Sequence, residues 1–252
     1  MEFKIPTETI TLPSKGLLYP KDNILSKGEI ELSYMTAKHE DILTNINYIK
    51  NGTVIDKLLE SLVVTPINFE DLLIGDKNAI MIAARILGYG KNYPIQFYNE
   101  STNQQEEYTV DLTSLNEKAV DMSLFKAGVN EFSFTLPQSK NNVTFKLLNS
   151  KDEKKIDQEI KGLKKLYPDQ SFDLTTRLKF IITSIEGSRE VKDVREFVDK
   201  CLIAQDSRAL RDYYNEVMPD IDLKITVNKD GYIQEDVTLP ISVNFFWPDS
   251  RV

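Results

Sequence analysis

Residue types that carry most enzyme chemistry are scarce in this sequence. It contains one histidine, His39, and one cysteine, Cys201. His39 is followed by Glu40 and Asp41, and a carboxylate there could orient the imidazole, but no nucleophile or metal ligand accompanies it at a useful spacing. We therefore interpret His39 as a partly exposed helical residue. Cys201 falls on the apolar side of a predicted helix, which is typical of a small buried side chain rather than a reactive thiol.

Cofactor and metal motifs are not recognisable either. Ser14-Lys15-Gly16 and the glycines at 88 and 90 lack the order of strand, glycine-rich loop and helix that a phosphate-binding loop has. The many acidic residues do not follow calcium-loop spacing, and one cysteine excludes an internal disulfide and a multi-thiolate zinc site. We expect no cofactor, no metal and no enzymatic activity. A cell-wall hydrolase, the alternative from the enzyme class, would need a cleft with paired acidic residues.

A basic pair near residue 210 is better suited to binding than to catalysis. Asp206 or Ser207 is predicted to cap a helix, and Arg208 and Arg211 then project one turn apart on one side. Such a pair can grip a carboxylate on a partner or brace the protein's own strands. We favour the structural role and retain both arginines as candidate partner-binding residues.

The aromatic run Phe245, Phe246 and Trp247 is the best candidate for a binding surface. On one strand, three consecutive side chains cannot all face inward. At least one of them must therefore be exposed or dock on another chain. We predict that replacing Phe246 and Trp247 by alanine abolishes partner association and leaves the monomer folded.

Residues 1–27 are predicted to form an extended N-terminal arm. Its prolines exclude a helix, and isolated apolar residues alternate with polar ones. The arm cannot bury its larger apolar residues against itself, so it must lie across its own domain or across a neighbouring subunit, and both arrangements remain open. The candidate anchors in the arm are Leu12, Leu17, Leu18 and Tyr19.

Composition and charge narrow the class of protein. With 252 residues, of which 41% are hydrophobic and 10% aromatic, the chain can bury a globular core. Its net charge of −8 argues against a surface that binds nucleic acid. No apolar run approaches the roughly 20 residues that span a bilayer, and the first residues lack the layout of a secretory signal. We expect no nucleic-acid binding, no stable membrane insertion, and synthesis in a reducing cytoplasm.

The most apolar stretch that is compatible with a helix, Asn68 to Tyr93, is predicted to hold the central core helix. Asn68 caps a short first turn that ends at Gly75, and Asp76 begins a second helix with its carboxylate near the positive end of the helix dipole. The buried face of that helix repeats at helical spacing and consists of Ile80, Ala83, Ala84 and Leu87.

Helical and twofold patterns alternate along the rest of the chain. Strands are predicted at residues 28–35, 93–98, 107–112, 131–136, 143–148, 223–227 and 237–245, of which the last six form three antiparallel hairpins. Helices are predicted at residues 36–48, 54–62, 151–166, 174–185, 191–203 and 206–217. We therefore predict an α+β fold in which helical units are interleaved with antiparallel β-hairpins. After the arm come residues 28–148, with a strand, a helical unit and hairpins, and residues 149–252, a helical unit with a C-terminal hairpin.

Several short segments stand in a distinctive order along the chain. They are residues 12–20 (LPSKGLLYP), 28–30 (GEI), 35–37 (MTA), 40–43 (EDIL), 71–78 (DLLIGDKN), 85–90 (RILGYG), 206–211 (DSRALR) and 245–248 (FFWP). In this order they resemble the baseplate-hub proteins of T4-like contractile-tailed bacteriophages, from near residue 12 to residue 248. The resemblance brings no catalytic residues. It implies paired cysteines in some relatives at the hairpins matching 93–112 and 223–245, where this sequence has none, so cross-strand packing is expected to hold these hairpins.

The resemblance implies a protein that helps to build the central hub of the phage tail baseplate by docking to other proteins. Its implied location is the host bacterial cytoplasm during assembly, and the tail baseplate if it is retained in the virion. The alternative within the family is a transient, chaperone-like hub-assembly factor that is absent from the mature virion. Implied partners are other baseplate and hub proteins, with a homo-oligomer as a further option.

Overall fold

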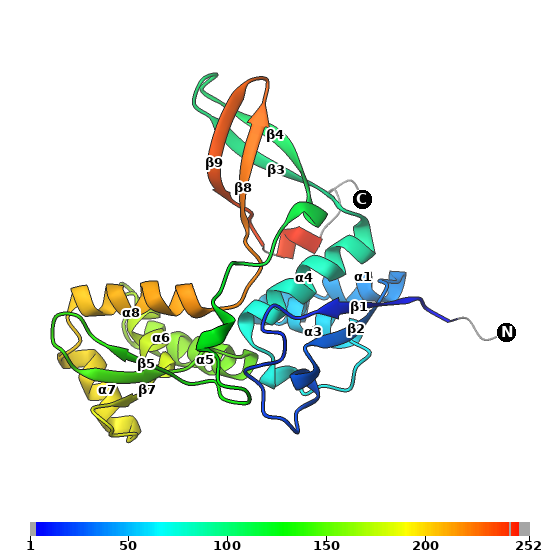
Figure 1. Ribbon diagram of the computed structural model, residues 1–252. Coiled ribbons are helices and arrows are strands. Elements are labelled where there is room, and N and C mark those ends of the chain that lie inside the picture. The colour runs from blue at the N-terminus through cyan, green and yellow to red at the C-terminus, as the bar shows by residue number, and fades with distance from the viewer. Residues whose placement is uncertain (1–3, 242, 247–252) are drawn as a thin grey trace.

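The computed structural model describes residues 4–241 and 243–246. The helices gather into two lobes, formed by residues 7–89 and 132–217, and two β-hairpins project together from the junction of the lobes (Figure 1). The strands of the described residues pair antiparallel in small separate sheets, so the predicted α+β class is confirmed. Among these residues no helix is long and apolar enough to cross a membrane.

The N-terminal lobe begins with two paired strands and continues with four helices. Strand β1 (Thr7–Thr11) runs antiparallel to β2 (Glu29–Ser33), which folds the arm back onto the chain that follows it. The predicted helix at residues 36–48 is instead two helices, because the Asn45 side chain accepts hydrogen bonds from backbone N–H groups of the next turn and starts a new helix. The four helices are α1 (Ala37–Leu43), α2 (Ile46–Asn51), α3 (Val54–Leu62) and α4 (Ile74–Tyr89).

Helix α4 is the central helix, and it starts earlier than predicted. A short 3-10 turn, Phe69–Asp71, is capped by Asn68, and α4 then begins at Ile74, so that Gly75 lies inside its first turn. A Cβ atom at Gly75 would lie 1.8 Å from the backbone oxygen of Pro219. Glycine is therefore required there for the close approach of the helix to a distant segment, and not to break the helix.

The first and last hairpins pack against each other and form one projecting unit, the hairpin pair. The ring of Phe97 stacks on that of Tyr232 with centroids 6.3 Å apart, and the Lys229 ammonium lies 3.3 Å from the Glu106 carboxylate. These contacts join the two hairpins without any cysteine. The four strands are β3 (Asn92–Asn99), β4 (Gln104–Asp111), β8 (Lys224–Lys229) and β9 (Tyr232–Thr238).

The C-terminal lobe combines four helices with a three-stranded sheet of order β5-β6-β7. The predicted helix at residues 174–185 ends at Ile181, and residues 182–185 form β7, because their alternating burial and β-branched side chains fit the open edge of β6. The strands are β5 (Phe132–Thr135), β6 (Asn142–Phe145) and β7 (Ile182–Ile185). The helices are α5 (Ser150–Leu166), α6 (Asp173–Ile181), α7 (Val191–Lys200) and α8 (Ala204–Val217).

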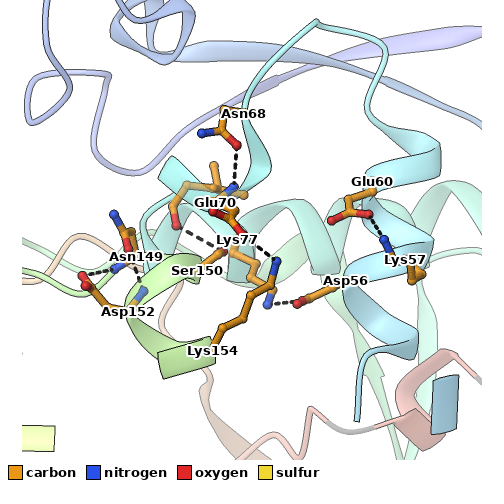
Figure 2. Close-up of polar contacts among 11 residues, drawn as sticks. Asp56, Lys57, Glu60, Asn68, Glu70, Lys77, Asn149, Ser150, Asp152 and Lys154 are labelled. Carbon is orange, nitrogen blue, oxygen red and sulfur yellow. Dashed lines mark hydrogen bonds and ion pairs between the residues drawn. The ribbon is translucent and has the colours of Figure 1, made fainter. Parts of the chain in front are cut away.

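The two lobes meet where α5 begins beside the segment that precedes α4 (Figure 2). Asn149 and Asp152 form a capping box at the start of α5. The Ser150 N–H donates to a backbone carbonyl just before α4 at 2.9 Å, and the Lys154 ammonium lies 3.5 Å from the Glu70 carboxylate. Buried apolar side chains form one continuous cluster through both lobes, so the lobes share a hydrophobic core.

Candidate docking surfaces

The arm that was predicted to supply anchors packs into its own chain. Leu12, Leu18 and Tyr19 are only 0%, 2% and 4% exposed, and Leu17 is partly exposed. The burial follows from the pairing of β1 with β2, which the Leu12 N–H extends by donating to the Gly28 carbonyl oxygen at 2.8 Å. Of the two arrangements left open, the structure has the arm across its own domain, where Leu12, Leu18 and Tyr19 are buried and only Leu17 of the four candidate anchors is partly exposed.

A buried carboxylate in the first turn of α4 holds the arm in place. Asp76 is 1% exposed, and its two oxygens accept hydrogen bonds from the Ser14 N–H at 2.9 Å, the Ser14 hydroxyl at 2.7 Å and the Tyr19 hydroxyl at 2.6 Å. The Tyr19 oxygen in turn accepts from the Leu73 N–H at 2.9 Å. Burial raises the pKa of Asp76, and the hydrogen bonds from Tyr19 and Ser14 oppose that rise because they stabilise the carboxylate. Burial and the neighbouring Asp76 charge raise the pKa of Tyr19 well above its ordinary value.

The C-terminal aromatic run is also buried where the structure describes it. Phe245 and Phe246 are both 0% exposed, and Trp247 lies outside the described residues. Their segment is a 3-10 turn, Val243–Phe246, and not the predicted strand, so consecutive side chains need not alternate between two faces. The Phe245 ring packs edge-on against Tyr93 with centroids 4.9 Å apart. The prediction of a strand at these residues is therefore wrong, and Phe245 and Phe246 are buried inside the chain rather than exposed as anchors.

The basic pair on α8 is exposed, but its two members have different surroundings. Helix α8 begins before Asp206, whose buried carboxylate accepts hydrogen bonds from two backbone N–H groups of the β5–β6 turn at 2.8 and 3.0 Å. Arg208 lies 3.8 Å from the exposed Asp212 carboxylate. The Nε–H of Arg211 donates to the Ser207 carbonyl oxygen at 3.2 Å, and no carboxylate of the described residues forms an ion pair with Arg211.

Arg211 lines a groove between α6 and α8, the α6–α8 groove, which encloses about 270 Å3. Its apolar lining includes Leu174, Leu178 and Met218, and its polar lining includes Arg177. The Arg177 guanidinium makes two hydrogen bonds to the Glu153 carboxylate, at 2.6 and 3.0 Å, which raise the pKa of Arg177. The groove thus combines an apolar floor with the Arg177–Glu153 pair, the Arg211 guanidinium, which forms no ion pair with a described residue, and the Asp212 carboxylate.

An apolar corner where α5 meets α6 adjoins this groove. Leu166 and Tyr167 are 72% and 51% exposed, and Leu174, which belongs to both the corner and the groove, is 47% exposed. The Tyr167 ring packs against Phe172, two residues before Leu174, with centroids 5.8 Å apart. The sequence analysis predicted a helix at residues 151–166 but did not identify this corner. The available signal was the pair Leu166-Tyr167 directly before Pro168, where the helical pattern ends.

The single histidine and the single cysteine of the sequence do not form a functional site. His39 is 8% exposed, less than predicted, because its Nδ1 accepts from the Thr36 N–H at 2.9 Å in the capping box of α1. Cys201 is exposed and not buried as predicted, because α7 ends at Lys200 and the chain turns there. Within residues 4–241 and 243–246, no group of three His, Cys, Asp or Glu side chains is placed to hold a metal ion.

Comparison with known protein families gives a match that covers nearly the whole sequence. The sequence fits the family described as T4 bacteriophage base plate protein over residues 6–247, a range that includes both lobes and the hairpin pair. No curated protein and no solved structure matches the chain. The match covers almost the whole sequence and agrees with the resemblance noted above for residues 12–248. The chain therefore belongs to the T4 bacteriophage base plate protein family.

Proposed function

We propose that the chain is a component of the baseplate hub and that it acts by docking other baseplate proteins on the apolar corner and the α6–α8 groove. Membership of the family supports a structural role in the phage tail baseplate, with other baseplate proteins as partners. The observation that carries the docking proposal is the exposure of Leu166, Tyr167 and Leu174, the last of which lines the groove together with Arg211.

Physical chemistry favours this surface over the arm and the aromatic run. Burying an aliphatic side chain stabilises an interface by about 1.5–3 kcal/mol, and only side chains that are exposed in the free protein can contribute that energy. Tyr and Arg are enriched among the residues that dominate binding energy, and this surface holds Tyr167 and Arg211. We propose a non-enzymatic role for the same surface, because each of the two carboxylates that line the groove lies beside an arginine: Glu153 is paired with Arg177, and Asp212 lies 3.8 Å from Arg208.

Co-purification from infected cells tests the proposal. A tagged chain that carries Tyr167→Ala and Leu174→Ala should recover about tenfold less of the hub proteins than the wild type, because both anchors are lost. The matched control carries Ile46→Ala and Val191→Ala, which remove similarly exposed apolar side chains (65% and 68%) elsewhere. Circular dichroism should show that both variants fold, since exposed positions contribute little to stability. Equal recovery of hub proteins by the wild type and both variants would contradict the proposal.

Analysis of purified virions tests retention in the particle. A hub component should appear in tail preparations by mass spectrometry, at a fixed ratio to other baseplate proteins. The assembly-factor alternative has the opposite expectation: peptides of the chain in infected-cell extracts and none in purified virions. The second result would refute a structural role in the finished hub.

A further inference from the structure

The α6–α8 groove is shaped for an aliphatic side chain followed at a short distance by a carboxylate. Leu174 is 47% exposed at the groove and lies among further apolar lining residues. The Arg211 guanidinium is held by its hydrogen bond to the Ser207 carbonyl oxygen. Among the described residues no carboxylate lies within ion-pair distance of it, although Glu153 and Asp212 also line the groove. An incoming carboxylate would find a cation that is already oriented, which reduces the entropy lost on binding.

The outer face of β9 has the complementary pattern. Ile233 is 59% exposed and Glu235 is exposed, and as residues i and i+2 of one strand they lie on the same face. The register of β8 and β9 shifts between Ile225 and Val227, so the strand carries a bulge near Glu235. The neighbouring Asp236 lies 3.3 Å from the Lys224 ammonium, whereas Glu235 forms no ion pair with any residue that the structure describes.

The chain cannot bring these two surfaces together by itself. Strand β9 starts at the free end of the hairpin pair, which points away from both lobes, and α6 and α8 lie in the lobe on the other side of the junction (Figure 1). The two surfaces therefore meet only between separate molecules. We propose that the outer face of β9 of one copy docks in the α6–α8 groove of a second copy, with Ile233 on the apolar lining and Glu235 against Arg211.

A contact between two different surfaces has a consequence for assembly. Each copy offers one groove and one β9 face, so each copy binds two neighbours in a head-to-tail arrangement. Such an arrangement closes into a ring when its rotation permits, and otherwise extends as a chain. In a linked copy the groove is occupied by its neighbour, so other baseplate proteins dock there on Leu166 and Tyr167 of the corner, which the contact leaves exposed. The contact does not depend on the proposed hub function.

Charge reversal in the purified chain tests the contact. The wild type should self-associate as concentration rises in sedimentation velocity experiments. Arg211→Glu and Glu235→Arg should each weaken association about tenfold, and the double variant should recover most of the loss because the pair is restored with opposite polarity. Lys50→Glu, which reverses an exposed charge on α2 in the other lobe, serves as the control. A wild type that stays monomeric, or a double variant no better than the single ones, would overturn the proposal.

Cysteine pairing tests the geometry directly. Chains with Leu174→Cys and chains with Ile233→Cys, both in a Cys201→Ser background, should form disulfide-linked dimers when they are mixed under a mild oxidant. Chains with Val191→Cys, on the exposed start of α7, should not link to Ile233→Cys chains. Absence of the first dimer, or equal yield of both, would refute the contact. These experiments contain no other phage protein, so their failure leaves co-purification of hub proteins as a separate test of the proposed function.

Discussion

Asp220 is expected to make the protein less stable as the pH rises from 5 to 8. It lies after α8 and is 7% exposed, and its two carboxylate oxygens accept from the Asn78 amide at 3.0 and 3.1 Å. Its backbone carbonyl oxygen accepts a hydrogen bond from the Lys118 N–H at 2.9 Å. The residue therefore connects α4 with the segment that follows the first hairpin and with the segment that precedes the last one. Burial raises the pKa of Asp220 to about 6 and outweighs the hydrogen bonds, which lower it.

The magnitude follows from the difference between the pKa of Asp220 in the folded chain, about 6, and its ordinary value of 3.8. Because the folded state holds the proton more tightly, the contribution of Asp220 is most favourable below pH 3.8 and is lost as the pH rises through 6. At about 1.4 kcal/mol per pKa unit the full loss is about 3 kcal/mol. About half of this loss has already occurred at pH 5, so the further loss between pH 5 and pH 8 is about 1.4 kcal/mol.

Urea unfolding at pH 5 and pH 8 measures this difference. The comparison is between the wild type and Asp220→Asn, because the other titrating groups are common to both proteins and cancel. Between the two pH values the free energy of unfolding should fall by about 1.4 kcal/mol more in the wild type than in Asp220→Asn. Asp222→Asn, an exposed carboxylate two residues away, controls for the change in net charge. If the wild type and Asp220→Asn lost the same free energy of unfolding, the argument from burial would be refuted.

Three further changes test the packing around α4. Tyr19→Phe should lower the free energy of unfolding by about 1.5–3 kcal/mol in urea, because it removes a hydrogen bond to the buried Asp76 carboxylate; no loss would contradict the role of that contact. Gly75→Ala should lower the melting temperature because its Cβ would overlap a backbone oxygen, whereas Gly162→Ala in α5, where the space is open, should add up to about 1 kcal/mol; the reverse order would refute the packing argument. Phe245→Ala should cost about 3–5 kcal/mol of stability by urea titration, and a fully stable variant that only loses a partner would restore the docking interpretation of the aromatic run.

Local signals in the sequence were sufficient to predict helix boundaries where capping residues and apolar periodicity agree. Helix α3 occupies the predicted residues 54–62, and α5 begins within one residue of its predicted start. The start of α5 was predictable because the side chains of Asn149 and Asp152 form its capping box, which satisfies free backbone N–H groups at the helix start whatever surrounds it. The twofold pattern was equally informative for the first hairpin, where the edges of β3 and β4 fall within three residues of the prediction. It failed for the last strand, since β9 spans Tyr232–Thr238 and not the predicted residues 237–245.

Prediction failed where a distant segment decides the local structure. Residues 182–185 continue the helical pattern of α6, but the open edge of β6 offers backbone hydrogen bonds that a helix there would forgo. The same limit applies to Asp76, whose position suggested only a helix start. Its hydrogen bonds to Ser14 and Tyr19 depend on how the arm returns to α4, which no short-range pattern records. The exposed corner at Leu166 is likewise defined by what the remaining chain leaves uncovered.

The energetics of the arm explain why the docking surface that we propose consists of side chains that are already exposed. Releasing the arm to a partner would expose Leu12 and Leu18, at a cost of about 3–6 kcal/mol. It would also break the hydrogen bonds of Ser14 and Tyr19 to the Asp76 carboxylate, for about 3–6 kcal/mol more. The sum is comparable to the whole binding free energy of a micromolar to nanomolar complex, about 8–12 kcal/mol. A partner that displaced the arm would have to recover that energy before gaining any affinity, whereas one that covers the apolar corner bears no such cost.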